Sequence, residues 1–191
     1  MVQVKLLFVN MQCHNVATHT LLNTNKDANI ILIQEPWFDK IGINHSDLDP
    51  NGEETFGGVA NPGWDLLYPK TACNSHCKVM AYRRIASTHF NVTNRLDLAS
   101  NHHLLTLDVH LGSSSFHIIN VYHDTDHPAS LRNILELDLD LVTSTIVGGD
   151  FNTHAHAWSL PGIQPSPWAL DLKEWALSQT LDLLSPPGVP T

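Results

Sequence analysis

The stretch Thr145-Ile146-Val147-Gly148-Gly149-Asp150-Phe151-Asn152 joins a short β-branched run to two polar side chains. Such a run is typical of a buried strand, and the polar residues follow where the strand leaves the core. In most proteins an acidic or amide residue after a strand forms a turn or caps a helix. The meaning of Asp150 and Asn152 therefore depends on what the other strands carry at their ends.

Three further apolar runs end in side chains of similar chemistry. The first run, Val4–Val9, ends in Asn10, and the second, Asn29–Ile33, ends in Gln34-Glu35. The third begins at Phe116 and ends in Asn120-Val121-Tyr122-His123-Asp124. The carboxyl ends of strands in open α/β sheets line the crevices where sites form, so we expect these side chains to converge. Carboxylate and amide oxygens suit Mg²⁺ or Mn²⁺ and do not suit zinc.

The rest of the first two thirds of the chain alternates strands and helices, which indicates an α/β protein. Between the first two strands, Asn15 is expected to cap a helix over Val16 to about Asn25. The segment 39–63 is rich in Gly, Asn, Asp and Pro and is expected to be a loop. Further strands are expected at 64–68, 78–83, 104–111 and 116–122, with a hairpin turn at 112–115.

Two more helices are expected in the last third of the chain. One begins at Asp126 or His127, and its apolar face consists of Leu131, Ile134, Leu135 and Leu139. The residues 136–141 also fit the alternation of a strand, so a strand is the alternative there. The other covers about Ser166 to Ser178 and uses Trp168, Leu172, Trp175 and Ala176 for its apolar face.

The composition is that of one globular domain of 191 residues, of which 42 % are hydrophobic and 15 % are charged. These values exclude a disordered or fibrous chain, and the aliphatic runs are too short to cross a bilayer, so no membrane partner is expected. The N-terminus lacks the pattern of a secretory signal, and three cysteines make no disulfide framework. We expect an intracellular protein that is not secreted.

The charge balance bears on the partners of the chain. Ten basic and 19 acidic residues give a formal net charge of −9, and the basic residues form no block or stripe. The intrinsic affinity for nucleic acid is therefore expected to be weak. An acidic excess instead suits a site that holds a hard cation.

With these motifs in place, the chain resembles the endonuclease/exonuclease/phosphatase superfamily, whose members have the DNase I-like fold. The motifs are Val9-Asn10, Ile33-Gln34-Glu35-Pro36-Trp37, Ile119-Asn120-Val121-Tyr122 and Gly149-Asp150-Phe151-Asn152. The sequences Gln34-Glu35-Pro36-Trp37 and Gly149-Asp150-Phe151-Asn152 look most like those of the endonuclease domain of LINE-type (non-LTR) retrotransposons, especially those of fungi. The resemblance implies a single domain over residues 1–191, a four-layer α/β sandwich in which helices flank two mixed sheets.

The resemblance also implies metal-dependent hydrolysis of a phosphodiester bond. Glu35 would hold Mg²⁺ (or Mn²⁺) with the help of Asn10 and Asp150, and Asp150 would also orient or deprotonate the attacking water. Asn152 and Tyr122 would position the scissile phosphate. The implied partners are a DNA substrate and a downstream reverse transcriptase domain in a parent polyprotein, and the implied location is the nucleus.

The chain departs from the family in its C-terminal part. The family's last strands carry an Asp-His pair, whereas no such pair follows Asn152 and the pair Asp126-His127 opens a helix. We therefore expect a C-terminally truncated fold with an open sheet edge, which favours self-association. Three functions stay open: a nuclease, a catalytically dead remnant that acts at most as a binding fragment, and a phosphatase of the same superfamily.

A zinc site is the competing interpretation of two other clusters. Suitable ligands are present in two segments, His154-Ala155-His156 and Cys73-Asn74-Ser75-His76-Cys77. A structural zinc site, however, takes its four ligands from two paired segments of this kind (zinc knuckles), and no second knuckle of the usual spacing is found in the sequence. A nucleophilic Cys13 activated by His14 is also disfavoured, because neighbours in an extended segment point to opposite faces.

Overall fold

The chain is described by a computed structural model over residues 3–46, 49–69, 77–95, 100–127, 129–139, 143–155, 158–159 and 162–184. It divides into two compact units. The first unit contains Met1–Tyr122 and Ser144–Asp150, and the second contains His123–Thr143 and Phe151–Thr191. Of the predicted site residues, Asn152 belongs to the second unit and the others belong to the first.

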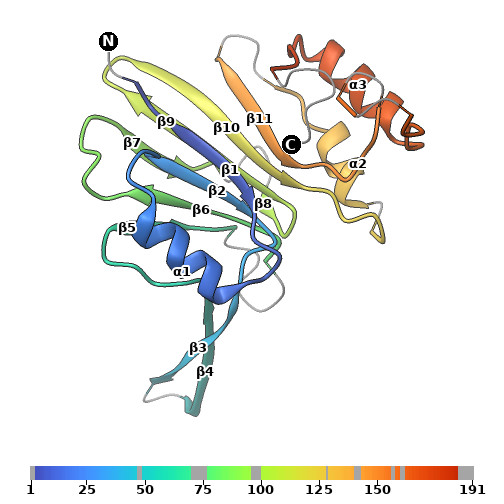
Figure 1. Cartoon of the computed structure of the whole chain (residues 1–191). Helices are drawn as coiled ribbons and strands as arrows, with labels where there is room; N and C mark the ends of the chain where they lie inside the picture. Colours follow the sequence, from blue (N-terminus) through green and yellow to red (C-terminus); the bar gives the residue numbers. More distant parts are fainter. Residues whose placement is uncertain are drawn as a thin grey trace. The chain divides into compact units, whose positions relative to one another are not determined.

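Two mixed sheets make up most of the first unit (Figure 1). The N-terminal sheet contains, in spatial order, β1 (Leu6–Asn10), β2 (Ile30–Gln34), β6 (Val79–Arg84) and β5 (Trp64–Leu67). β1 and β2 are parallel, while β6 is antiparallel to β2 and to β5. The four strands that the sequence predicts for this half of the chain are confirmed.

The C-terminal sheet repeats the same pattern. Its spatial order is β11 (Thr145–Asp150), β10 (Ser114–Tyr122), β9 (Leu104–Leu111) and β7 (Asn91–Asn94), and β8 (Ser100–Asn101) also pairs with β9. β10 and β11 are parallel, and the other pairs are antiparallel. The sequence analysis missed β7 and β8, because β8 has two residues and β7 has a single apolar side chain, Val92.

Aliphatic side chains from both sheets form the main core between them. Ile30 and Leu32 of β2 belong to one cluster with Leu107 and Ile118 of the C-terminal sheet. The alternate side chains of β2 lie in a second cluster on the outer face of the N-terminal sheet, together with Leu22. Every residue of β2 is buried, which explains why its sequence is an unbroken aliphatic run.

α1 (Asn15–Thr24) covers that outer face (Figure 1). The predicted cap, Asn15, is wrong, because the capping residue is His14. The backbone of His14 is extended, and its Nδ1 accepts a hydrogen bond of 3.2 Å from the backbone N–H of Ala17. The imidazole thus does what a Ser or Asp side chain does at most helix starts.

Residues 39–46 and 49–57 are two paired strands, so the prediction of a loop over 39–63 is wrong for most of its length. β3 (Asp39–Ser46) pairs with β4 (Asp49–Gly57) as an arm that extends from the sheet (Figure 1). The register shifts between Lys40 and Gly42 and again between Asn44 and Ser46. Bulges of this kind accommodate turn-forming residues inside a strand pair, which conceals the pairing in the sequence.

A buried phenol fixes the chain where the hairpin returns to the sheet. The hydroxyl of Tyr82 donates a hydrogen bond of 2.9 Å to the carbonyl of Val59. Burial raises the pKa of Tyr82 above its ordinary value, so the phenol stays protonated and remains a donor.

In the described part of the second unit, α2 (Ala129–Leu135) and α3 (Ala169–Ser178) pack on each other. The indole N–H of Trp175 donates to the carbonyl of Leu137 at 3.0 Å.

The two helices differ from their predicted bounds. α2 ends four residues before Leu139, and 136–139 is not a strand. α3 begins three residues later than predicted, and Trp168 is 38 % exposed instead of buried. Residues 140–141 of the alternative strand lie outside the described residues.

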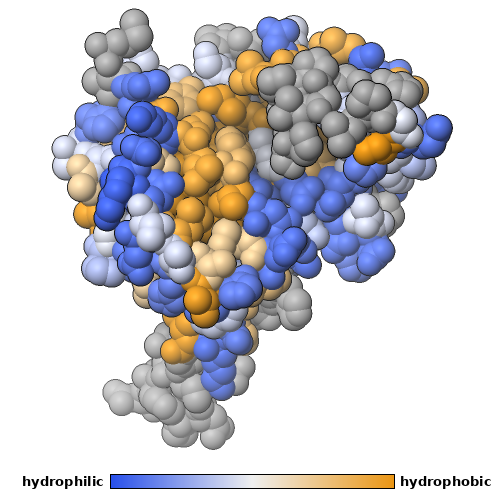
Figure 2. Space-filling model, in the orientation of Figure 1, coloured by the Kyte–Doolittle hydropathy of each residue, from blue (hydrophilic) through white to orange (hydrophobic). Residues whose placement is uncertain are grey.

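β1 and β11 are the outermost strands of their sheets, and each pairs with one neighbour in the described part of the chain. All residues of both strands are partly exposed. Figure 2 shows hydrophobic residues gathered on the face on which Figure 1 draws β1. The two open edges therefore border apolar surface. No helix among the described residues is long and apolar enough to span a membrane.

We expect the isolated chain to self-associate, because an unpaired strand edge beside apolar surface readily pairs with another chain. In sedimentation velocity runs, the weight-average sedimentation coefficient should rise with protein concentration. A single monomeric species at every concentration would contradict this expectation.

Candidate active site

The polar ends of four strands lie at one edge of the two sheets. In the N-terminal sheet, the parallel register of β1 and β2 sets Asn10 beside Gln34. In the C-terminal sheet, the parallel register of β10 and β11 sets Tyr122 beside Asp150. The carboxyl ends of parallel neighbours meet at the same edge, as the sequence analysis expected.

Two side-chain hydrogen bonds join these ends across the sandwich. The Nδ2 of Asn10 donates to Oδ2 of Asp150 at 2.8 Å. The hydroxyl of Tyr122 donates to Oε1 of Glu35, also at 2.8 Å. Each carboxylate is thus held by a residue of the opposite sheet, and the two acidic groups share one edge of the first unit.

The backbone of Glu35 is held in an uncommon conformation. Its φ of 45° lies in the left-handed region, which a non-glycine residue adopts at a cost in free energy. Two hydrogen bonds compensate: the N–H of Glu35 donates to the carbonyl of Lys78 at 2.9 Å, and its carbonyl accepts from the N–H of Cys13 at 2.7 Å. This turn aims the side chain away from the line of β2 and toward Tyr122.

Two glycines bring Asp150 into place at the end of β11. A Cβ on Gly149, whose φ is 140°, would lie 2.0 Å from the carbonyl oxygen of Val121. A Cβ on Gly148 would lie 2.6 Å from the ring of Phe8. The pair therefore permits β11 to approach both β10 and β1 closely, as the hydrogen bond from Asn10 to Asp150 requires.

Two buried amides, Gln34 and Asn120, lie behind the carboxylates; the sequence analysis placed both among the polar strand ends but assigned neither a role. Asn120 is fully buried, and its Nδ2 donates to the carbonyls of Ile33 and Met80, both at 3.0 Å. Its Oδ1 accepts from Nε2 of Gln34. A polar amide inside the apolar run 118–121, two residues before Tyr122, was the signal in the sequence.

Asn152 is described within the second unit. Its φ of 44° is left-handed, which Asn tolerates better than most residues. Its Nδ2 donates to the carbonyl of His123 at 2.8 Å. The structure thus brings together Asn10, Glu35, Tyr122 and Asp150, while the predicted contact between Asn152 and a phosphate remains a prediction.

The donors at this edge fit a hard cation. Glu35 gives one carboxylate oxygen to Tyr122, and its second oxygen accepts no hydrogen bond from the described residues. Asn10 uses its oxygen for the N–H of Gln12 at 2.8 Å and its amino group for Asp150, so its visible contribution is to hold Asp150. Carboxylate oxygens without nitrogen or sulfur ligands are typical of Mg²⁺ and Mn²⁺ sites. The described residues contain no group of three or more His, Cys, Asp and Glu side chains placed around one point.

The zinc interpretations gain no support within the described residues. Cys77 is buried, and its thiol donates to the carbonyl of Val79, while Cys73 and His76 lie outside the described part. The backbone N–H of His154 donates to the hydroxyl of Ser166, and His156 is also outside the description.

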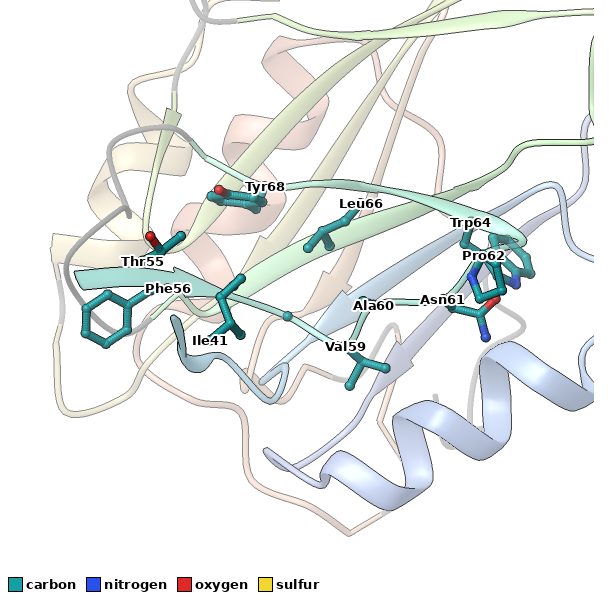
Figure 3. Close-up of a pocket in the computed structure, with 12 residues that line it drawn as sticks. Ile41, Thr55, Phe56, Val59, Ala60, Asn61, Pro62, Trp64, Leu66 and Tyr68 are labelled. Atoms are coloured by element: carbon teal, nitrogen blue, oxygen red, sulfur yellow. The ribbon is translucent and has the colours of Figure 1, made fainter. Parts of the chain in front are cut away.

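An apolar groove of about 490 Å³ lies apart from the carboxylates, where the end of β4 meets β5 (Figure 3). Its lining includes Phe56, Val59, Pro62, Trp64 and Leu66. No charged side chain is among the described residues that line it, so the groove lacks the groups that acid–base or metal chemistry would need.

Comparisons with known proteins bear on the fold. No protein-family model matches the chain, and no curated protein does. Among solved structures, the chain is similar to the endonuclease domain of TRAS1, a telomere-specific non-LTR retrotransposon. The TM-score is 0.72 at 17 % sequence identity, and the match covers 99 % of this chain and 76 % of that one. The chain has the DNase I-like fold. This confirms the predicted fold class.

We expect replacement of Asn120 by leucine to lower the free energy of unfolding by about 3 kcal/mol, because two buried carbonyls and the Gln34 amide would lose their partner. Urea denaturation followed by fluorescence measures the change. Asn91→Leu, at an exposed position of β7, is the matched control and should change stability by no more than about 0.5 kcal/mol. Equal stabilities for the two variants would contradict the role assigned to Asn120.

Proposed function

We propose that the chain hydrolyses phosphodiester bonds and nicks DNA in a metal-dependent reaction, as an endonuclease of the non-LTR retrotransposon type. One observation carries the proposal: Glu35 and Asp150 are held at the same sheet edge by hydrogen bonds from Tyr122 and Asn10. The likeness in fold to a retrotransposon endonuclease domain supports the same class of reaction.

In this proposal Glu35 and Asp150 hold Mg²⁺ or Mn²⁺, and Asn10 completes the site by fixing Asp150. When bound, the ion would offset the negative charge that builds up on the phosphoryl oxygens. The all-oxygen character of the donors and the open second oxygen of Glu35 support this assignment.

The remaining roles concern protons and orientation. Asp150 accepts a proton from the attacking water, whose oxygen forms a bond to phosphorus while the bond to the departing sugar oxygen breaks. The Tyr122 hydroxyl and the Asn152 amide position the phosphate, because both donate hydrogen bonds without adding negative charge. The hydrogen bond from Tyr122 to Glu35 supports a position of the hydroxyl close to the ion.

The proposed partners follow from this activity. DNA is the substrate, and a net charge of −9 suits a nuclease that binds DNA weakly and releases the nicked product. A downstream reverse transcriptase domain in the parent polyprotein, a nuclear location and a fungal relationship belong to the same proposal.

One observation favours a second candidate, a chain that retains the fold without the activity. In the described part, Glu35 and Asp150 are not joined by a third acidic or imidazole side chain around one point. With two carboxylates alone, the ion and the leaving oxygen would be less well supported. A phosphatase remains the third possibility, because one fold serves several substrates.

We expect the protein to nick supercoiled plasmid with Mg²⁺ and to be inactive with EDTA. Glu35→Gln and Asp150→Asn should each lower the rate by at least about 100-fold, since each removes a carboxylate on which the chemistry depends. Asp27→Asn is the matched control, because it also replaces a carboxylate by an amide at an exposed position, and it should keep the wild-type rate.

The outcomes separate the three functions. Nicking by the wild type and by Asp27→Asn alone supports the nuclease. Equal nicking rates for the wild type and both site variants would contradict the nuclease function and favour the inactive fragment. Release of phosphate from a phosphomonoester without any nicking would identify a phosphatase.

A further inference from the structure

A lysine beside the carboxylates has no role in the proposed reaction so far. Lys78 directly precedes β6. Its carbonyl accepts from the N–H of Glu35, and its N–H donates to the carbonyl of His102, both at 2.9 Å. The backbone of Lys78 is therefore fixed relative to Glu35.

The ammonium group of Lys78 lies next to the phenol that contacts Glu35. Its Nζ is 5.4 Å from the centre of the Tyr122 ring, within the range of a cation–π contact. The ring of His103 stacks on Tyr122, with centroids 6.4 Å apart and planes 10° from parallel. Lys78 forms no ion pair with a carboxylate among the described residues.

Three arginines of the first unit, by contrast, are engaged in structural contacts. Arg83 pairs with Asp65 at 2.9 Å. The guanidinium of Arg84 donates to two backbone carbonyls, both at 2.9 Å. Arg95 lies 3.0 Å from Nε2 of His117. These guanidinium groups have partners, whereas the ammonium of Lys78 rests on an aromatic face.

We propose that Lys78 binds a backbone phosphate of DNA at the rim of the site and so positions the strand for cleavage, an inference that rests on the proposed nuclease function. The argument is electrostatic. In a chain of net charge −9, two carboxylates at the site repel a polyanion, and a cation beside them offsets this repulsion locally. A cation–π contact at a partly exposed position is weak, so a phosphate can draw the ammonium away from Tyr122.

The test is DNA binding in the absence of metal. Fluorescence anisotropy of a short labelled DNA duplex in EDTA gives the affinity over a series of NaCl concentrations. For Lys78→Gln, the affinity should fall roughly tenfold near 0.1 M salt, and the slope of log K against log[salt] should become shallower by about 0.9. Lys78→Arg should keep most of the affinity and the slope, because it keeps the charge.

Lys26→Gln is the matched control, because it removes the same charge from an exposed lysine just after α1. It should leave the slope unchanged. Equal losses in Lys78→Gln and Lys26→Gln would overturn the inference, as would a wild type that binds no DNA at low salt. The nicking assay judges the proposed function separately, since a wild type that nicks while Lys78→Gln binds normally refutes the inference alone.

Discussion

The arrangement of the candidate site depends on one buried amide. Asn120 enters the space between the sheets and hydrogen-bonds the carbonyls of Ile33 and Met80, which belong to two strands of the opposite sheet. Aliphatic contacts hold the sheets together but allow them to slide, since they have little directionality. Directed hydrogen bonds from a residue without solvent contact fix the register between the sheets. Tyr122, two residues further along β10, is thereby aimed at Glu35.

The same edge carries the strained and tightly packed backbone of the first unit. Glu35 is left-handed, and Gly149 lies where no other residue would fit. Such positions cost free energy and persist where the surrounding structure determines them. Here they aim Glu35 at Tyr122 and let Asp150 approach Asn10, so that both carboxylates lie at one sheet edge, and the second oxygen of Glu35 accepts no hydrogen bond from the described residues. A site for a divalent ion and a phosphate needs this kind of pre-organisation.

The sequence predicts the parts of the fold that have a strong local signal. β2 is an aliphatic run that ends in polar residues, so its burial and its end can be anticipated. The end of β11 can be anticipated in the same way, but the expected burial of this strand is wrong, because it is the outermost strand of its sheet and all its residues are partly exposed. The β3–β4 hairpin could not be anticipated, because its bulged pairing suits turn-forming residues that are typical of loops. The helix cap at His14 was missed because an imidazole is an uncommon capping group. The convergence of Asn10, Glu35, Tyr122 and Asp150 could be predicted from strand order, whereas the hydrogen bonds that pair them across the sheets depend on tertiary packing.

A crystal grown with Mn²⁺ and measured at the manganese absorption edge would test the central claim most directly. The account predicts one anomalous peak at the sheet edge, bound to Glu35 and linked to Asp150 either directly or through a coordinated water. Manganese bound elsewhere, with the two carboxyl groups turned away from each other, would contradict it.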